Sequence, residues 1–135
     1  MTTVRDLMTR DVTTVSRTET VDVVYERMLD QQVRHMPVVD DQDELAGIIS
    51  HRDIAALLGR YSQESFATQA HTLATVTAEA CMSRGLATVE PDSDLKDAAE
   101  LMLEHKLGCL PVCEGAHIVG ILTEADFVWH VAQGG

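Results

Sequence analysis

The stretch Gly47-Ile48-Ile49-Ser50-His51-Arg52-Asp53 returns further along the chain as Gly120-Ile121-Leu122-Thr123-Glu124-Ala125-Asp126. Both stretches keep a glycine, two aliphatic residues, a hydroxyl residue and, three positions later, an aspartate. A hydroxyl residue with an acidic residue three positions later is typical of a helix N-terminus, because each side chain can bond the backbone N–H of the other. We therefore predict that each stretch is the end of a strand followed directly by a capped helix.

The similarity extends outward from these stretches into an internal duplication. Residues 8–40 align with residues 82–114 at an offset of 74, which becomes 73 after one deletion in the second copy. The aligned residues include Met36-Pro37-Val38 and Leu110-Pro111-Val112. Chance similarity between two amphipathic stretches would not keep these features in order and in register.

Each copy is predicted to have the order strand-helix-strand-strand-helix, which makes the fold class α+β. Thr20 and Asp94 are N-cap residue types that precede apolar residues spaced as on a helix face, so a helix of about a dozen residues begins there. A second helix is expected near Ser50 and Thr123. The strands, which are short and rich in β-branched residues, are predicted at residues 12–15, 36–39 and 45–49 of the first copy and at residues 86–89, 110–113 and 118–122 of the second.

The stretch between the copies contains no proline and is predicted to be an ordered helical linker. Phe66, Ala70, Leu73 and Ala74 could line one face of a helix capped by Ser62. Thr3 and Thr77 are each expected to cap a short turn before a methionine. The predicted domains are residues 1–58 for the first repeat, 59–77 for the helical linker and 78–135 for the second repeat.

Composition excludes several classes of protein. The chain has 135 residues with 10 Lys+Arg against 22 Asp+Glu, a net charge of −12, which disfavours a nucleic-acid partner. No apolar run approaches the ~20 residues of a membrane-spanning helix, and no apolar core of signal-peptide length follows Met1. We expect a cytoplasmic protein that does not bind a membrane. The cysteines, Cys81, Cys109 and Cys113, are odd in number and are expected to be reduced thiols.

The two sets of ordered motifs resemble the cystathionine-beta-synthase (CBS) domain, and two such domains in tandem resemble a Bateman module. The resemblance covers nearly the whole chain apart from the linker. It implies two pseudo-symmetric repeats with two clefts between them, which in this family commonly hold adenosine-containing ligands such as AMP, ATP or S-adenosylmethionine. It also implies a sensor of such a ligand rather than an enzyme, with no cofactor required.

The resemblance assigns roles to particular residues. Asp53 and Asp126 would accept hydrogen bonds from ribose hydroxyls, and Ser50 and Thr123 would meet ribose or phosphate oxygens; a carboxylate suits a vicinal diol and a helix N-terminus suits a phosphate. His51 and Arg52 are candidates for phosphate contact. The remaining candidates would frame the base or line the clefts: Val12, Thr13, Thr14, Val15, His35, Met36, Pro37 and Ile49 in the first copy, and Leu86, Ala87, Thr88, Val89, Cys109, Leu110, Pro111 and Leu122 in the second.

Each assignment has a simpler alternative. Ser50 with Asp53, and Thr123 with Asp126, could serve only as capping boxes, although capping and ligand contact can coexist. His51 and Arg52 could be ordinary solvated residues of a first helical turn. Because Glu124 and Ala125 replace them in the second copy, we expect unequal clefts, with AMP or ATP at Asp53 and a less anionic adenosyl compound or nothing at Asp126.

Cys109 and Cys113 lie near His105 and His117, which suggests zinc, but without a C-x-x-C pair we favour small apolar core residues. The sequence lacks G-x-S-x-G, H-E-x-x-H, P-loop and G-x-G-x-x-G motifs.

We therefore expect a non-catalytic regulatory module that signals to an unidentified protein. The alternatives are an oligomerising scaffold with degenerate clefts and a thiol-based redox sensor. A homodimer is expected because the capped helices should expose apolar residues near their ends, such as Leu57, Leu58, Phe127 and Trp129.

Overall fold

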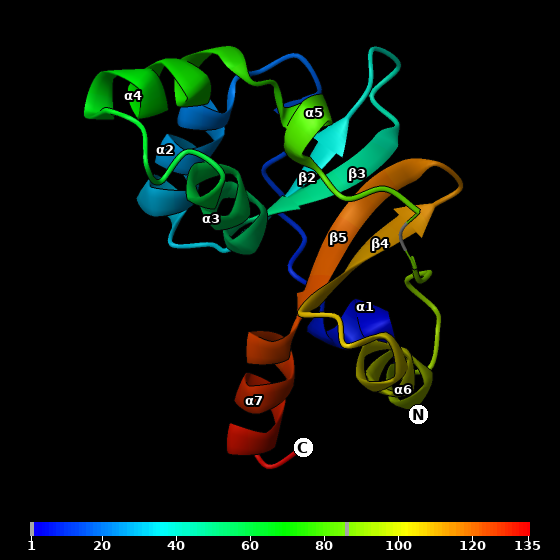
Figure 1. The fold of residues 1–135 in the computed structure, drawn as a ribbon. Coiled ribbons are helices and arrows are strands. Elements are labelled where there is room, and N and C mark those ends of the chain that lie inside the picture. The colour runs from blue at the N-terminus through cyan, green and yellow to red at the C-terminus, as the bar shows by residue number, and fades with distance from the viewer. Residues whose placement is uncertain (1, 86) are drawn as a thin grey trace. The chain divides into compact units, whose positions relative to one another are not determined.

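The computed structural model describes residues 2–85 and 87–135. It divides into two compact units: the first-repeat unit, Thr13–Leu86, and the second-repeat unit, Met1–Val12 with Ala87–Gly135. Both units mix helices with a small sheet, so the α+β class is confirmed (Figure 1). The domain boundaries at residues 1–58, 59–77 and 78–135 remain a prediction.

The first-repeat unit is a three-stranded sheet with four helices. Its strands are β1 (Val15–Ser16), β2 (His35–Val39) and β3 (Leu45–Ser50); β1 runs parallel to β2, and β2 pairs antiparallel with β3. Its helices are α2 (Val21–Gln31), α3 (His51–Gly59), α4 (Phe66–Thr75) and α5 (Ala78–Cys81). Val24, Met28, Met36 and Ile49 are among the residues of its buried core.

The second-repeat unit has a two-stranded hairpin where the first-repeat unit has a three-stranded sheet. It contains α1 (Val4–Leu7), α6 (Leu95–His105), β4 (Cys109–Glu114), β5 (His117–Thr123) and α7 (Glu124–Ala132). Val4, Ala98, Leu110 and Leu122 lie in its buried core. Val89 makes a single parallel bridge to Val112, where the first-repeat unit has β1 beside β2.

The segment before each copy packs in the unit of the other copy. Thr9 and Ile121 exchange backbone hydrogen bonds of 2.9 and 3.0 Å in the second-repeat unit. Ile48 and Ser83 do the same in the first-repeat unit, at 3.1 and 2.8 Å. Each segment therefore extends the edge of the sheet that carries the repeated glycine stretch.

This packing of each segment against the unit of the other copy explains why the repeated stretch contains a glycine. A Cβ atom on Gly47 would lie 2.6 Å from Met82 Sδ and 2.7 Å from the Ser83 carbonyl oxygen. A Cβ atom on Gly120 would lie 2.7 Å from Met8 Sδ. The glycine at this position makes room for the incoming segment.

The strands predicted before the long helices are shorter than expected. The strand predicted at residues 12–15 is observed only at Val15–Ser16, because pairing with β2 reaches no further than Val15. Of the strand predicted at residues 86–89, Leu86 lies outside the described residues and Val89 forms the isolated bridge.

The helix between the copies begins later than predicted. Ser65, not Ser62, caps α4, because its Oγ accepts from the backbone N–H of Thr68 at 3.2 Å. The predicted apolar face is also wrong in part: Phe66 is 87% exposed, whereas Thr72 is buried. Thr72 can be buried because its hydroxyl donates to the Thr68 carbonyl at 3.0 Å.

Candidate functional site

The site predicted in the first repeat is built on the junction of β3 and α3. Ser50 is the N-cap of α3, and Asp53 lies in its first turn. Asp53 Oδ2 accepts from the Ser50 backbone N–H at 2.8 Å and from its hydroxyl at 3.0 Å, while the Asp53 N–H donates to Ser50 Oγ at 3.2 Å. The capping box proposed as the simpler alternative is therefore present.

The second repeat has the same arrangement at the junction of β5 and α7. Asp126 Oδ2 accepts from the Thr123 backbone N–H at 2.8 Å and from its hydroxyl at 3.1 Å. Among the described residues, no hydrogen bond reaches Oδ1 of either Asp53 or Asp126. Both residues are half-buried. Each carboxylate thus commits one oxygen to its helix and keeps the other as an acceptor for a further donor.

The charge beside the two aspartates differs between the repeats. His51 and Arg52 are exposed at the start of α3, where α7 presents exposed Glu124 and Ala125. The backbone N–H of His51 donates to the Arg34 carbonyl oxygen at 2.8 Å. The centroid of the His51 ring lies 6.3 Å from that of the Tyr25 ring. The first repeat therefore offers positive charge at this helix start, and the second offers a carboxylate.

The hairpin of each unit brings part of the predicted set together. His35 lies opposite Ser50 and Met36 lies opposite Ile49 in one hairpin; Cys109 opposite Thr123 and Leu110 opposite Leu122 are the counterparts in the other. The core members of the set have buried side chains: Val15, Met36, Pro37, Ile49, Cys109, Leu110, Pro111 and Leu122.

The other candidates are more accessible. Those that are half-buried are Val12, Thr13, Thr14, His35, Ala87 and Val89. Thr88 is exposed, and Leu86 lies outside the described residues.

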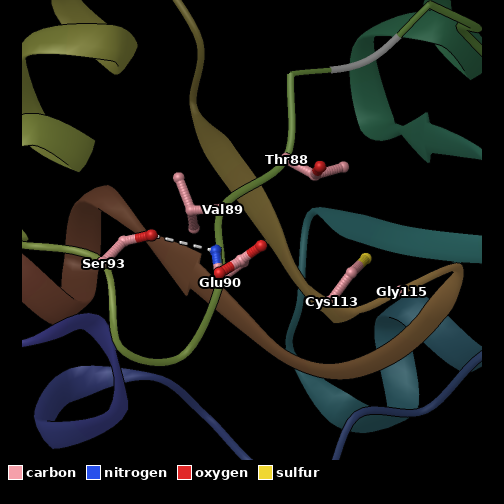
Figure 2. A pocket seen from close by; sticks show the side chains of 6 residues that line it. All are labelled: Thr88, Val89, Glu90, Ser93, Cys113 and Gly115. Atoms are coloured by element: carbon pink, nitrogen blue, oxygen red, sulfur yellow. Dashed lines mark hydrogen bonds between the residues drawn. The ribbon is translucent and has the colours of Figure 1, made fainter.

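A hollow of about 360 Å³ lies in the second-repeat unit (Figure 2). Its lining residues are Thr88, Val89, Glu90, Ser93, Cys113 and Gly115. Thr88 and Val89 belong to the predicted set, and the other four were not predicted from the sequence. Glu114 at the far end of β4 pairs with His117, whereas Thr123 pairs with Cys109 at the opposite end, so the hollow and the capped aspartate occupy different ends of the hairpin.

The environments of the cysteines weaken the redox alternative. Cys109 and Cys113 are buried, as the core interpretation predicted. Burial raises the pKa of Cys109 to about 12 and also raises the pKa of Cys81 and Cys113. A reactive thiol requires a lowered pKa, so all three shifts have the wrong direction for a sensor thiol. Within residues 2–85 and 87–135, no group of three or more His, Cys, Asp or Glu side chains could hold a metal ion.

Comparison with known proteins identifies the class. The CBS domain family model matches residues 4–60 and 78–132, so the chain belongs to the CBS domain family and carries two such domains in tandem. The resemblance inferred from the sequence is confirmed. In the described part of the chain, no helix is long and apolar enough to cross a bilayer.

Particular relatives are similar over most of the chain. The CBS domain-containing protein YhcV of Bacillus subtilis is 33% identical over 129 residues, covering 93% of this chain and 83% of YhcV. The crystal structure of a putative acetoin utilization protein (AcuB) from Vibrio cholerae has a TM-score of 0.84 at 34% identity, covering 98% of this chain and 92% of that one. The structure of CBSX2, from Arabidopsis thaliana, in complex with AMP has a TM-score of 0.82 at 29% identity and covers 98% of both chains.

Some curated relatives are much longer than this chain. The matching region is 22% of a homoserine O-acetyltransferase from Methanocorpusculum labreanum, at 31% identity. It is 22% of an inosine-5'-monophosphate dehydrogenase from Methanocaldococcus jannaschii, at 27% identity. The similarity to these enzymes therefore concerns a fraction of each.

Proposed function

We propose that this tandem CBS module is a non-catalytic sensor that binds an adenosine-containing ligand and passes the signal to a partner protein. The observation that carries the proposal is the repeated capped aspartate, which uses Oδ2 for its helix and keeps Oδ1 for a donor such as a ribose hydroxyl. The AMP complex of the similar CBSX2 supports an adenosyl ligand.

The charge difference between the repeats supports a division of ligands. Arg52 and His51 at the start of α3 favour the phosphate of AMP or ATP near Asp53. Two like charges 4 Å apart cost about 4 kcal/mol at an effective dielectric of 20. Glu124 therefore disfavours a phosphate near Asp126, where a less anionic adenosyl compound such as S-adenosylmethionine would fit better.

Calorimetric titration with AMP, ADP, ATP, S-adenosylmethionine and NAD tests the proposal. We expect binding of at least one compound, and we expect Asp53→Ala to weaken nucleotide binding by about 1.5 to 3 kcal/mol, the value of a charge-assisted hydrogen bond. Because Asp53 also caps α3, Asp53→Asn is the matched control: its one amide oxygen can still accept from Ser50, but its amide nitrogen cannot accept from a ribose hydroxyl. Full affinity in Asp53→Asn, or no binding to the whole panel, would leave capping as the role of Asp53.

A scaffold with degenerate clefts is the second candidate, favoured by the exposed apolar residues of α7. Val128, Trp129 and Val131 are 69%, 61% and 69% exposed. Leu57, expected to be exposed, is instead buried in the first-repeat core. We propose that α7 contributes to a homodimer. Light scattering should then give twice the 14.8 kDa of one chain at micromolar concentration, and a value near 14.8 kDa would reject the dimer.

A further inference from the structure

The two incoming segments are held by equivalent backbone bonds. The N-terminal segment (residues 2–12) packs in the second-repeat unit, and the connecting segment (residues 76–85) packs in the first-repeat unit. In each segment two successive amides donate to the loop before the long helix: Val4 to Ser93 at 2.9 Å and Arg5 to Pro91 at 2.8 Å, and Ala78 to Glu19 at 2.7 Å and Glu79 to Arg17 at 3.0 Å. Backbone bonds therefore do not distinguish one segment from the other.

The side-chain charges at these contacts are reversed between the units. Arg5, in the N-terminal segment, donates from Nη2 to Asp92 at 3.2 Å. Glu79 occupies the aligned position of the connecting segment and accepts from Arg17 Nη1 at 2.9 Å. If the two segments exchanged places, Arg5 would face Arg17 and Glu79 would face Asp92. Both contacts would then be repulsive.

The sizes of the buried side chains are also reversed between the units: where one segment carries the larger residue, its partner on the long helix is the smaller one, and the other unit has the opposite order. Val4 of the N-terminal segment shares the second-repeat core with Ala98 of α6, and both are 0% exposed. At the aligned positions, Ala78 of the connecting segment shares the first-repeat core with Val24 of α2, again at 0% exposure. An exchange would bring two alanines into one core and two valines into the other, which would create a cavity and an overlap.

We propose that these two reversals are a recognition code that directs each incoming segment to one repeat: the N-terminal segment to the second and the connecting segment to the first. The code concerns the candidate sites as well, because each segment covers the glycine of the repeated stretch and bonds the strand that ends at Ser50 or Thr123. The proposal does not depend on the ligand.

Native-state hydrogen exchange on the full chain tests the size reversal. In Val4→Ala, the Arg5 and Thr9 amides, which bond Pro91 and Ile121, should exchange roughly tenfold faster or more, because a buried side chain is truncated. Adding Ala98→Val should return the rates to within about threefold of the parent. Adding Val24→Ala instead is the matched control and should leave the fast rates of Val4→Ala unchanged. The proposal is overturned if Ala98→Val gives no recovery or if Val24→Ala gives as much.

A double-mutant cycle on Arg5 and Asp92 tests the charge reversal independently. Arg5→Glu should speed exchange of the same amides by about threefold at low salt, the range of an exposed ion pair. The added change Asp92→Arg should reverse the effect, and high salt should diminish it. Arg34→Glu makes the same change in net charge on an exposed residue of the other unit and should leave these amides unaffected. Additive effects of Arg5→Glu and Asp92→Arg, or an equal effect of Arg34→Glu, contradict the charge part of the code and overturn the proposal.

Discussion

At the scale of single residues, the glycine of the repeated stretch has a packing role. Gly47→Ala should reduce the free energy of unfolding by about 1 to 3 kcal/mol, because the new Cβ atom would overlap Met82 Sδ and the Ser83 carbonyl oxygen. Urea denaturation measures the loss. Gly59→Ala is the matched control: nothing lies within 4 Å of its Cβ position, and alanine at the end of α3 should be neutral or slightly stabilising. A loss in the control as large as that in Gly47→Ala would show that overlap is not the cause.

Burial of the Cys109 thiol should make the free energy of unfolding depend on pH. Its folded pKa of about 12 lies above the ordinary value of 9.0, because burial disfavours the thiolate. Above pH 9 the unfolded chain loses this proton while the folded chain keeps it, so the contribution to stability is complete below pH 9 and is lost between pH 9 and about pH 12. Over this pH range, the decline in the free energy of unfolding that is due to Cys109 should approach 1.4 kcal/mol per pH unit. Urea midpoints measured from pH 7 to 10.5 should therefore decline less steeply in Cys109→Ala than in the parent.

At the scale of elements, the start of α4 separates the sequence-based prediction from the structure. Ser65→Ala should cost about 1 kcal/mol of stability, since it removes the N-cap acceptor of the Thr68 amide. Ser62→Ala changes the residue first predicted to cap this helix and should cost almost nothing. Urea denaturation of both variants decides between the two starts. A larger loss for Ser62→Ala would contradict the observed helix start.

The elements that were predicted correctly have local signals. The hairpins and the helices after Thr20, Ser50, Asp94 and Thr123 depend on alternation, helical spacing and cap residues, all of which can be read within a few positions. β1 begins later than the predicted strand because its extent is set by pairing with β2, which is distant in sequence. For the same reason the spacing alone could predict the capped aspartates but not the hollow beside Gly115, which needs the β4–β5 turn and the loop at Glu90 together.

At the scale of the whole molecule, the sequence did not predict the crossing of the two segments, in which the segment before each copy packs in the unit of the other copy. The duplication places Thr3 and Thr77 in equivalent roles, but equivalence does not say which repeat each segment joins. That choice depends on contacts between residues far apart in the chain, such as Arg5 with Asp92 and Arg17 with Glu79. A repeat in sequence is therefore not the same set of residues as a compact unit in space.

This difference predicts which fragments can fold. Residues 13–86 form one contiguous compact unit, which includes Ala78 in its core and Ser83 at its sheet edge. The fragment 13–86 should therefore unfold cooperatively in urea and show dispersed amide resonances. The fragment 1–58, a complete repeat by sequence, lacks the connecting segment that bonds Ile48 and should lack both properties.

The second-repeat unit supplies the matched comparison, because its incoming segment is not contiguous with the rest. Residues 87–135 alone lack Val4, which is fully buried in the native unit, and should be unfolded. Joining residues 2–12 to residue 87 through a flexible glycine-serine linker should restore cooperative unfolding, since it returns the missing core residue and the strand partner of Ile121. Joining residues 76–85 by the same linker should restore much less, because it brings Ala78 in place of Val4 and Glu79 toward Asp92. Equal folding of the two fusions, or a folded fragment 1–58, would mean that each repeat can accept either segment and that the observed crossing follows from chain connectivity alone.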